Sequence, residues 1–114
     1  MDKTSHFDTE ALAMLEEIME DEFPELIQVF IADSDPRVPA MQNALDEQSS
    51  LALRDLAHSF KGASSNLSAL PLADLCFKVE EKARDTNLDG IQPLIAEIDS
   101  EYQTVKSILL SLIK

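Results

Sequence analysis

The stretch at residues 51–69, LALRDLAHSFKGASSNLSA, decides the fold of this chain and holds one of its two histidines. Its apolar residues recur three and four positions apart, which is the period of an amphipathic helix in a bundle. These residues are Leu53, Leu56, Phe60, Ala63 and Leu67. On a helical wheel at about 100° per residue they form one stripe, about 80° wide, that we expect to be buried. His58 lies on the opposite side of the wheel, so we expect it to face away from the core.

Gly62 is the second unusual residue of this helix. A glycine inside a helix costs about 1 kcal/mol relative to alanine, and Gly62 lies on the outer face with His58. It leaves a bare spot beside the imidazole, where another molecule can approach closely. The other residues expected on this face are Leu51, Arg54, Lys61 and Ser65.

The outer face combines groups that suit phosphoryl chemistry. An exposed imidazole is largely unprotonated at neutral pH and is then a nucleophile. Lys61 adds a flexible positive charge suited to an incoming anion. A nucleophile, a cation and a cleared approach favour a phosphoryl acceptor that is served by a partner protein. Ordinary solvated surface is the alternative, and geometry alone does not name the chemistry.

The rest of the chain has the same helical period, with no convincing strand pattern. We expect a short helix from Asp8, a helix from Pro24, a helix from Ser49 or Ser50 to about Ser68, a helix from Pro71, and a last helix from about Ile91. Pro36 and Pro39 either kink the second helix or divide it in two. Short connections make neighbouring helices antiparallel. The predicted fold is all-α, an antiparallel up-and-down four-helix bundle with a short additional N-terminal helix across one end, and residues 1–114 form one domain.

The first helix has a specific start signal. Asp8 is expected as its N-cap, with Phe7 and Leu12 packed together as a hydrophobic staple. Its apolar stripe is expected to consist of Leu12, Leu15, Ile18 and Met19. The acidic runs that follow are expected to be solvated helix surface.

Charge and composition restrict the partners. The 114 residues include 22 acidic and 9 basic side chains, for a net charge of −13. This charge argues against binding to nucleic acid or to an anionic membrane surface, and it favours a monomer. No apolar run is long enough to span a bilayer, and no signal-peptide core is seen at the N-terminus. The single cysteine cannot form an internal disulfide, so we expect a cytoplasmic protein.

Three other residues have simpler interpretations. His6 lies before the first helix and is expected to be solvated. Cys76 falls on the apolar stripe of the fourth helix and is expected to be a buried, inert thiol. Phe77 lies opposite that stripe; packing beneath the first helix is the favoured explanation, and partner docking is the alternative. Two histidines and one cysteine at these spacings resemble no zinc site.

Residues 56–69, LAHSFKGASSNLSA, closely resemble the signature of histidine-containing phosphotransfer (HPt) domains, approximately A-H-x-L-K-G-x-S-x-x-x-G-A. The family's next helix is resembled by Leu72, Leu75, Cys76, Val79 and Glu80. The likeness covers nearly the whole chain and suggests a stand-alone, bacterial-type phosphotransfer protein. Phe60 replaces the usual leucine. Ser68 replaces the usual second glycine, and we expect it to alter the turn between the third and fourth helices.

The resemblance implies roles for three residues. His58 is implied to be the phosphorylated residue, Lys61 to help neutralise the phosphoryl group, and Gly62 to admit the active site of the partner. The docking surface around them is expected to include Leu51, Arg54, Lys61, Gly62 and Ser65.

The resemblance also implies a relay. His58 is implied to accept a phosphoryl group from a receiver-domain aspartate of a hybrid sensor kinase and to pass it to the receiver domain of a response regulator. The receiver supplies Mg²⁺, and no cofactor is expected for this chain itself. Because the chain has no phosphate-cradling glycine loop, we expect a phosphoryl carrier that is not an enzyme and has no ATP site. The alternative is a non-catalytic helical adaptor that binds receiver domains.

Overall fold

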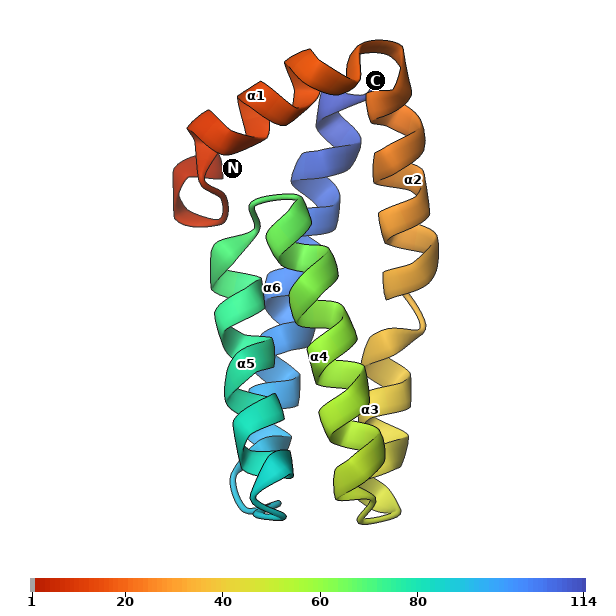
Figure 1. The fold of residues 1–114 in the computed structure, drawn as a ribbon, viewed down its shortest axis with the longest axis vertical. Helices are drawn as coiled ribbons and strands as arrows, with labels where there is room; N and C mark the ends of the chain where they lie inside the picture. Colours follow the sequence, from red (N-terminus) through yellow and green to blue (C-terminus); the bar gives the residue numbers. More distant parts are fainter. Residues whose placement is uncertain (1) are drawn as a thin grey trace.

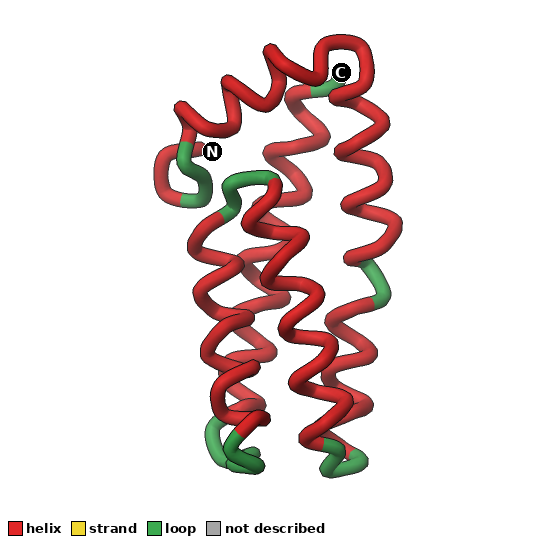
Figure 2. Tube along the Cα trace, viewed as in Figure 1, coloured by secondary structure: helices red, strands yellow, loops and turns green. Residues whose placement is uncertain are grey.

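The computed structural model describes residues 2–114, and every regular element in that part of the chain is a helix (Figure 2). The elements are the 3-10 helices η1 (Lys3–Ser5) and η2 (Glu20–Glu22) and the α-helices α1 (Thr9–Met19), α2 (Phe23–Ser34), α3 (Arg37–Asp46), α4 (Ser50–Asn66), α5 (Leu70–Arg84) and α6 (Ile91–Leu112). The four helices that pack side by side are α3, α4, α5 and α6 (Figure 1). α2 continues the line of α3 along the same side of the bundle, and α1 crosses one end (Figure 1). The predicted four-helix bundle with an additional N-terminal helix is confirmed.

Proline divides the predicted second helix into α2 and α3. α2 ends at Ser34, and α3 begins at Arg37 with Pro36 as its N-cap. Pro36 has no N–H group to continue the hydrogen bonds of α2, so the helix stops there. Pro39 lies in the first turn of α3, where an N–H group has no acceptor within the helix. Of the two predicted options, division into two helices is therefore the one observed.

The predicted helix starts are observed at α1 and α4. Asp8 Oδ1 accepts a hydrogen bond from the Ala11 backbone at 3.2 Å, and Ser49 Oγ accepts one from the Ala52 backbone at 3.2 Å. Such N-caps satisfy donors that a helix otherwise leaves without partners, and each stabilises its helix by about 1 kcal/mol. The positions of α1 and α4 are therefore set by local sequence.

The stripe predicted for α1 was wrong at one position. Phe7 and Leu12 are buried as expected for the staple, and Leu15 and Met19 pack at the edge of the core. Ile18 is 72% exposed. Because α1 lies across the end of the bundle, only one narrow line of its residues meets other helices.

The buried face of α4 is also wider than predicted. Its fully buried residues are Leu53, Ala57, Phe60 and Ser64, followed by Leu67 at its C-cap, whereas Leu56 and Ala63 are half-buried. α4 packs against α5 on one side and α3 on the other, so a single coiled-coil seam does not describe it. The outer face that carries His58 remains exposed.

Aromatic side chains fill the centre of the bundle. The fully buried Phe60 ring packs edge-on against the Tyr102 ring of α6, with centroids 5.6 Å apart. The ring centroid of Phe30 on α2 lies 6.1 Å from that of Tyr102. Such pairs add about 0.5–1.5 kcal/mol beyond area burial. Phe60 therefore has an aromatic partner at the position where the signature that the sequence resembles has leucine.

Ser68 adopts a backbone conformation that glycine takes more readily than other residues. Its φ of 62° lies in the left-handed region, and the backbone bonds Ser68 N→Ser65 O and Ala69 N→Ser64 O, both 2.9 Å, form a Schellman motif. The expectation that Ser68 alters this turn relative to the family stays a prediction. A residue with a Cβ adopts this conformation at some cost.

None of the helices described in residues 2–114 is both long enough and apolar enough to cross a lipid bilayer.

Candidate functional site

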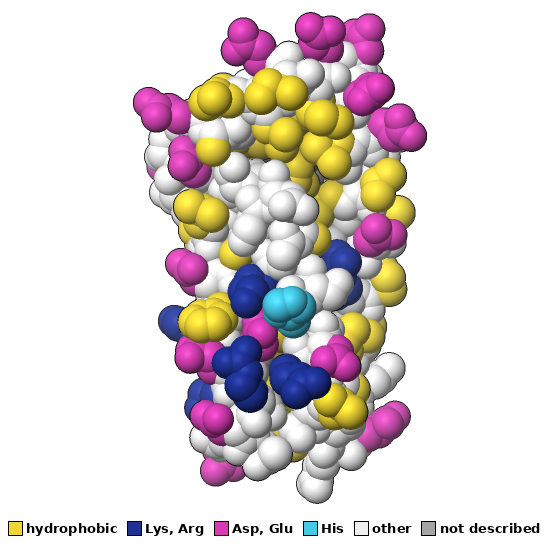
Figure 3. All heavy atoms as spheres, in the orientation of Figure 1, with side chains coloured by type: hydrophobic (Ala, Val, Ile, Leu, Met, Phe, Trp, Pro, Cys, Tyr) yellow, Lys and Arg dark blue, Asp and Glu magenta, His cyan; other side chains and the backbone are white. Residues whose placement is uncertain are grey.

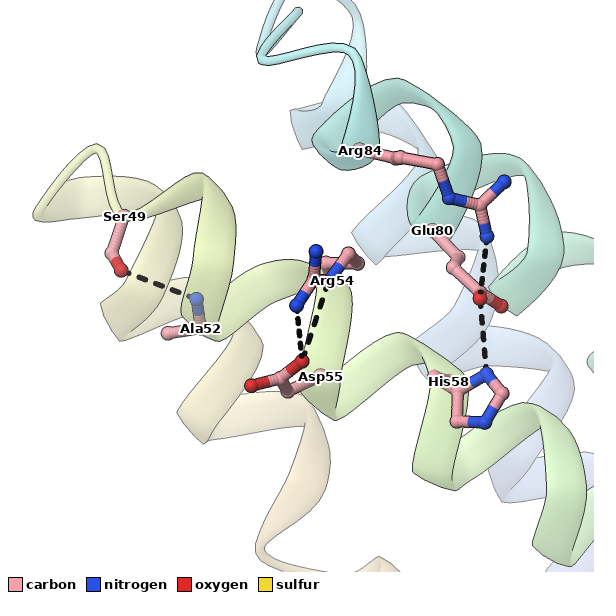
Figure 4. Close-up of polar contacts among 7 residues, drawn as sticks. All are labelled: Ser49, Ala52, Arg54, Asp55, His58, Glu80 and Arg84. Carbon is pink, nitrogen blue, oxygen red and sulfur yellow. Dashed lines mark hydrogen bonds and ion pairs between the residues drawn. The ribbon is translucent and has the colours of Figure 1, made fainter.

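His58 projects from α4 toward solvent, as predicted, and touches α5 at its base. Its side chain is 69% exposed. The ring Nδ1 lies 3.0 Å from Oε2 of Glu80 on α5 (Figure 4). The other ring nitrogen, Nε2, has no hydrogen-bond partner within residues 2–114. One face of the imidazole is therefore fixed by the protein, and the other is open.

Glu80 is the centre of the site, although it is only 3% exposed. Besides His58, its Oε2 accepts a hydrogen bond from Arg84 at 2.9 Å (Figure 4). Its Oε1 receives no well-directed hydrogen bond and depends on the ammonium of Lys61, which lies 2.8 Å away as an ion pair. A carboxylate is costly to bury without such partners, so these contacts are what permit its position.

The charge of Glu80 determines the tautomer of His58. Burial acts to raise the pKa of Glu80, but the Lys61 ammonium and the His58 ring outweigh burial and hold that pKa below its ordinary value. Glu80 is therefore ionised at neutral pH, and an ionised carboxylate only accepts hydrogen bonds. Nδ1 of His58 must then carry the hydrogen, which leaves the Nε2 lone pair free.

Gly62 is not required by the packing of this chain. A Cβ built at Gly62 would meet no atom within 4 Å, and the residue is exposed. Alanine would therefore fit and would be the better helix former. The predicted bare spot beside His58 is confirmed as a geometric fact.

The other predicted residues lie on the same face with different degrees of constraint. Leu51 and Ser65 are exposed. Arg54 is half-buried and pairs with Asp55 at 3.3 Å (Figure 4). Arginine and lysine side chains gather around a histidine on this face, whereas most of the acidic side chains lie toward the edges of the view (Figure 3). Against a net charge of −13, the site is a local basic area.

The family model of the Hpt domain matches residues 25–108. The chain belongs to the Hpt-domain family. The matched part contains all of α3, α4 and α5, and therefore His58, Glu80 and their partners.

Named relatives agree with this assignment. The phosphorelay protein LuxU of Vibrio vulnificus is 24% identical over 98 residues, which are 85% of each chain. Histidine-containing phosphotransfer protein B (HptB) of Pseudomonas aeruginosa PAO1 shares 40% sequence identity with this chain. Its crystal structure matches with a TM-score of 0.89, over 93% of this chain and 92% of that one. The histidine-containing phosphotransfer protein ZmHP2 from maize shares the fold, with a TM-score of 0.83, 21% identity and coverage of 100% and 91%. This Hpt domain is a phosphorelay intermediate in two-component signalling.

Sequence reasoning missed part of the site of this Hpt domain. It named Glu80 only within the family resemblance and did not mention Arg84. It also did not mention Arg37, which contacts the helix of His58 without touching the site itself. Arg37 lies at the start of α3, donates to Ser59 Oγ at 3.2 Å and lies over the Phe60 ring at 5.4 Å. One signal was available, because Glu80 is a charged residue on the apolar stripe of its own helix. A charge placed there needs a partner from a neighbouring helix.

Three simpler interpretations have different outcomes. Cys76 is buried, and burial raises the pKa of its thiol to about 12, as expected for an inert thiol. His6 is not solvated as predicted, because it is half-buried and its Nδ1 lies 2.7 Å from Oε2 of Glu101 on α6. Phe77 is not a core residue beneath α1, because its ring is 41% exposed and lies 5.0 Å from the ammonium of Lys61.

Proposed function

We propose that His58 carries the phosphoryl group of this relay on Nε2, accepting it from one receiver-domain aspartate and passing it to another. The observation that supports this proposal is the bond from Nδ1 to an ionised, buried Glu80. That bond leaves the nucleophilic lone pair on the exposed nitrogen. The open space at Gly62 supports the approach of a partner from the same side.

The transfer step follows from the tautomer. The Nε2 lone pair attacks the phosphorus of an aspartyl phosphate in line, the P–N bond forms as the P–O bond breaks, and the aspartate leaves as a carboxylate. The imidazole becomes positively charged, and its Nδ1–H remains bonded to Glu80. The carboxylate therefore stabilises the charge that develops on the ring. Reversal of the same step passes the group to a second receiver.

Nearby cations assist the phosphoryl group. Lys61 lies one helical turn after His58, and its ammonium shares the carboxylate that His58 binds. The incoming group brings additional negative charge, which Lys61 is suited to attract without leaving the site. Lys61 therefore has the role of charge neutralisation.

The partners are receiver domains of a hybrid sensor kinase and of a response regulator. In this proposal the receiver provides the aspartate and Mg²⁺, and this chain provides neither a cofactor nor an ATP site. The docking surface comprises Leu51, Arg54, Lys61, Gly62 and Ser65. Its local positive charge favours an acidic receiver pocket. We also propose that the protein acts as a monomer in the cytoplasm, because a net charge of −13 opposes self-association.

A labelling experiment with matched histidine variants tests this function. A receiver phosphorylated on its aspartate is mixed with the wild-type protein, with His58→Gln and with His6→Gln. We expect label on the wild type and on His6→Gln, and none on His58→Gln. Circular dichroism establishes that each variant remains helical, and ¹⁵N NMR of the imidazole identifies the phosphorylated nitrogen as Nε2.

The opposite outcomes are equally specific. Persistent label on a folded His58→Gln would remove His58 from the relay. Absence of label on the wild type, with receiver binding that His58→Gln does not change, would support the non-catalytic adaptor instead. Label acquired from ATP alone would contradict the proposal that this chain only carries the group.

A further inference from the structure

Phe77 is an exposed aromatic residue that lies against a residue of the site. The ammonium of Lys61 is 5.0 Å from the centroid of its ring. Phe77 and Glu80 are three positions apart on α5, so both side chains reach toward α4 from the same side of their helix. Lys61 is thus held by two groups of α5, the Phe77 ring and the Glu80 carboxylate at 2.8 Å.

These two groups act differently on Lys61. A carboxylate attracts an ammonium by cancelling its charge, and the single charge of Glu80 is already shared with Arg84 and His58. An aromatic face attracts an ammonium through its quadrupole and carries no net charge. The ring therefore restricts the ammonium while leaving its positive charge available to a phosphoryl group.

We propose that Phe77 is a positioning residue, which holds the Lys61 ammonium beside His58 before the phosphoryl group arrives. This inference rests on the proposed function of His58 and Lys61. A free lysine side chain has four rotatable bonds, and fixing it during the reaction has an entropic cost. Contact with the ring fixes much of it in advance, so it affects the rate of transfer within the docked complex.

The inference separates positioning from docking. If Phe77 acts through Lys61, its loss lowers the maximal rate of transfer and leaves the half-saturating receiver concentration unchanged. If the ring is instead a docking contact, its loss raises the half-saturating concentration and leaves the maximal rate unchanged. The position of the Lys61 ammonium over the Phe77 ring favours the positioning role.

The test compares Phe77→Leu, which keeps an apolar side chain, with Phe77→Tyr, which keeps the ring. Single-turnover transfer from a phosphorylated receiver is measured over a range of receiver concentrations. We expect Phe77→Leu to lower the maximal rate about two- to fivefold, the range that corresponds to an exposed cation–π contact, and Phe77→Tyr to restore it. Leu110→Ala is the matched control, because Leu110 is a similarly exposed apolar residue on α6.

A second arm uses phosphoramidate, a small donor that needs no docking surface. Its P–N bond breaks as the bond to Nε2 forms, and ammonia leaves. We expect Phe77→Leu to slow this reaction also, and to have no further effect when Lys61→Ala is present. Equal slowing with and without Lys61 would overturn the inference, as would a change in half-saturation alone.

The two levels of the proposal fail in different ways. If the wild type is labelled on His58 and Phe77→Leu transfers at the wild-type rate, only the positioning role is lost. If the wild type is labelled elsewhere than His58, the proposed function itself is lost. Melting temperatures of the Phe77 variants establish that each comparison is made between folded proteins.

Discussion

Glu80 and Asp35 are both carboxylates that collect donors from neighbouring helices, but they lie in different surroundings. Asp35 lies between α2 and α3, with about half of its side chain exposed, and accepts hydrogen bonds from Tyr102 at 2.6 Å and from Lys106 at 3.0 Å. These bonds hold the pKa of Asp35 below its ordinary value. They tie the break between α2 and α3 to α6.

The two clusters differ in whether a donor has a second reactive atom that is free of the carboxylate. Burial and the bond to Asp35 raise the pKa of Tyr102 far above its ordinary value, so its hydroxyl stays protonated. It donates within the protein, to Asp35 at 2.6 Å and to the Ile31 carbonyl at 3.4 Å. His58 gives one nitrogen to Glu80 and keeps a second one exposed. A polar cluster at a helix interface becomes chemically useful when one of its donors has a second reactive atom facing outward.

Exchange of each carboxylate for its amide gives the largest expected contrast. Glu80→Gln removes the charge that fixes the His58 tautomer and that, in the proposed step, stabilises the charged ring. We therefore expect transfer from a phosphorylated receiver to slow about 10- to 100-fold. Asp35→Asn should leave the transfer rate within about twofold of the wild type, because its cluster contacts no group of the site. Single-turnover labelling measures both. Equal rates for the two variants would contradict the functional distinction between these carboxylates.

Gly62→Ala is expected to separate stability from transfer. The added methyl group meets no atom of this chain, so the helix should gain up to about 1 kcal/mol in denaturant unfolding. Because the same methyl group enters the space through which we propose that the receiver approaches, receiver transfer should slow on the order of tenfold.

Phosphoramidate labelling is the control for Gly62→Ala and should be unchanged, since a small donor needs no cleared surface. Loss of stability in this variant, or receiver transfer at the full rate, would show that the glycine has another purpose.

Tyr102→Phe tests the structural cluster alone. The variant keeps the aromatic core contacts with Phe30 and Phe60. It removes the hydroxyl that donates a hydrogen bond to Asp35. We expect the free energy of unfolding to fall by about 1 kcal/mol, with receiver transfer unchanged. Urea denaturation gives the first quantity and labelling the second. A transfer defect as large as that of Glu80→Gln would mean that the two clusters are coupled.

The smallest expected effect comes from a residue outside both clusters. Ser68→Gly places glycine at a position with a φ of 62°, and relief of this strain should raise the free energy of unfolding by about 0.5–1 kcal/mol. The midpoint of thermal unfolding should rise and the transfer rate should not change. A lower midpoint would show that the Ser68 side chain has contacts that outweigh its backbone strain.

The sequence was sufficient where the signal is local. Helical period, the Asp8 and Ser49 caps and the prolines predict most of the elements, and the motif around His58 predicts the exposed face. Position relative to other helices is different, because a wheel shows which residues share a face without showing how wide the contact is. For this reason the prediction that Ile18 is buried was wrong, and the predicted buried face of α4 was narrower than the observed one.

Long-range partners were the other limit. His6 pairs with Glu101, which is 95 positions away, and no local pattern indicates such a contact. The role of Glu80 was easier to predict from the sequence. A charged residue on an apolar stripe needs a partner, although the sequence does not say which residue it is. Glu80 is bound by His58, Lys61 and Arg84. The contacts from His58 and Lys61 depend on the register between α4 and α5, which the sequence does not show.

The contacts of the site join residues that are closer in the chain than those of the Asp35 cluster. His58 and Glu80 are 22 positions apart, whereas Asp35 is 67 positions from Tyr102 and 71 from Lys106. Closing the shorter loop costs about 1 kcal/mol less in chain entropy, and local contacts favour fast folding. The site can therefore assemble within the α4–α5 hairpin, whereas the contacts between Asp35 and α6 require nearly the whole chain to have come together.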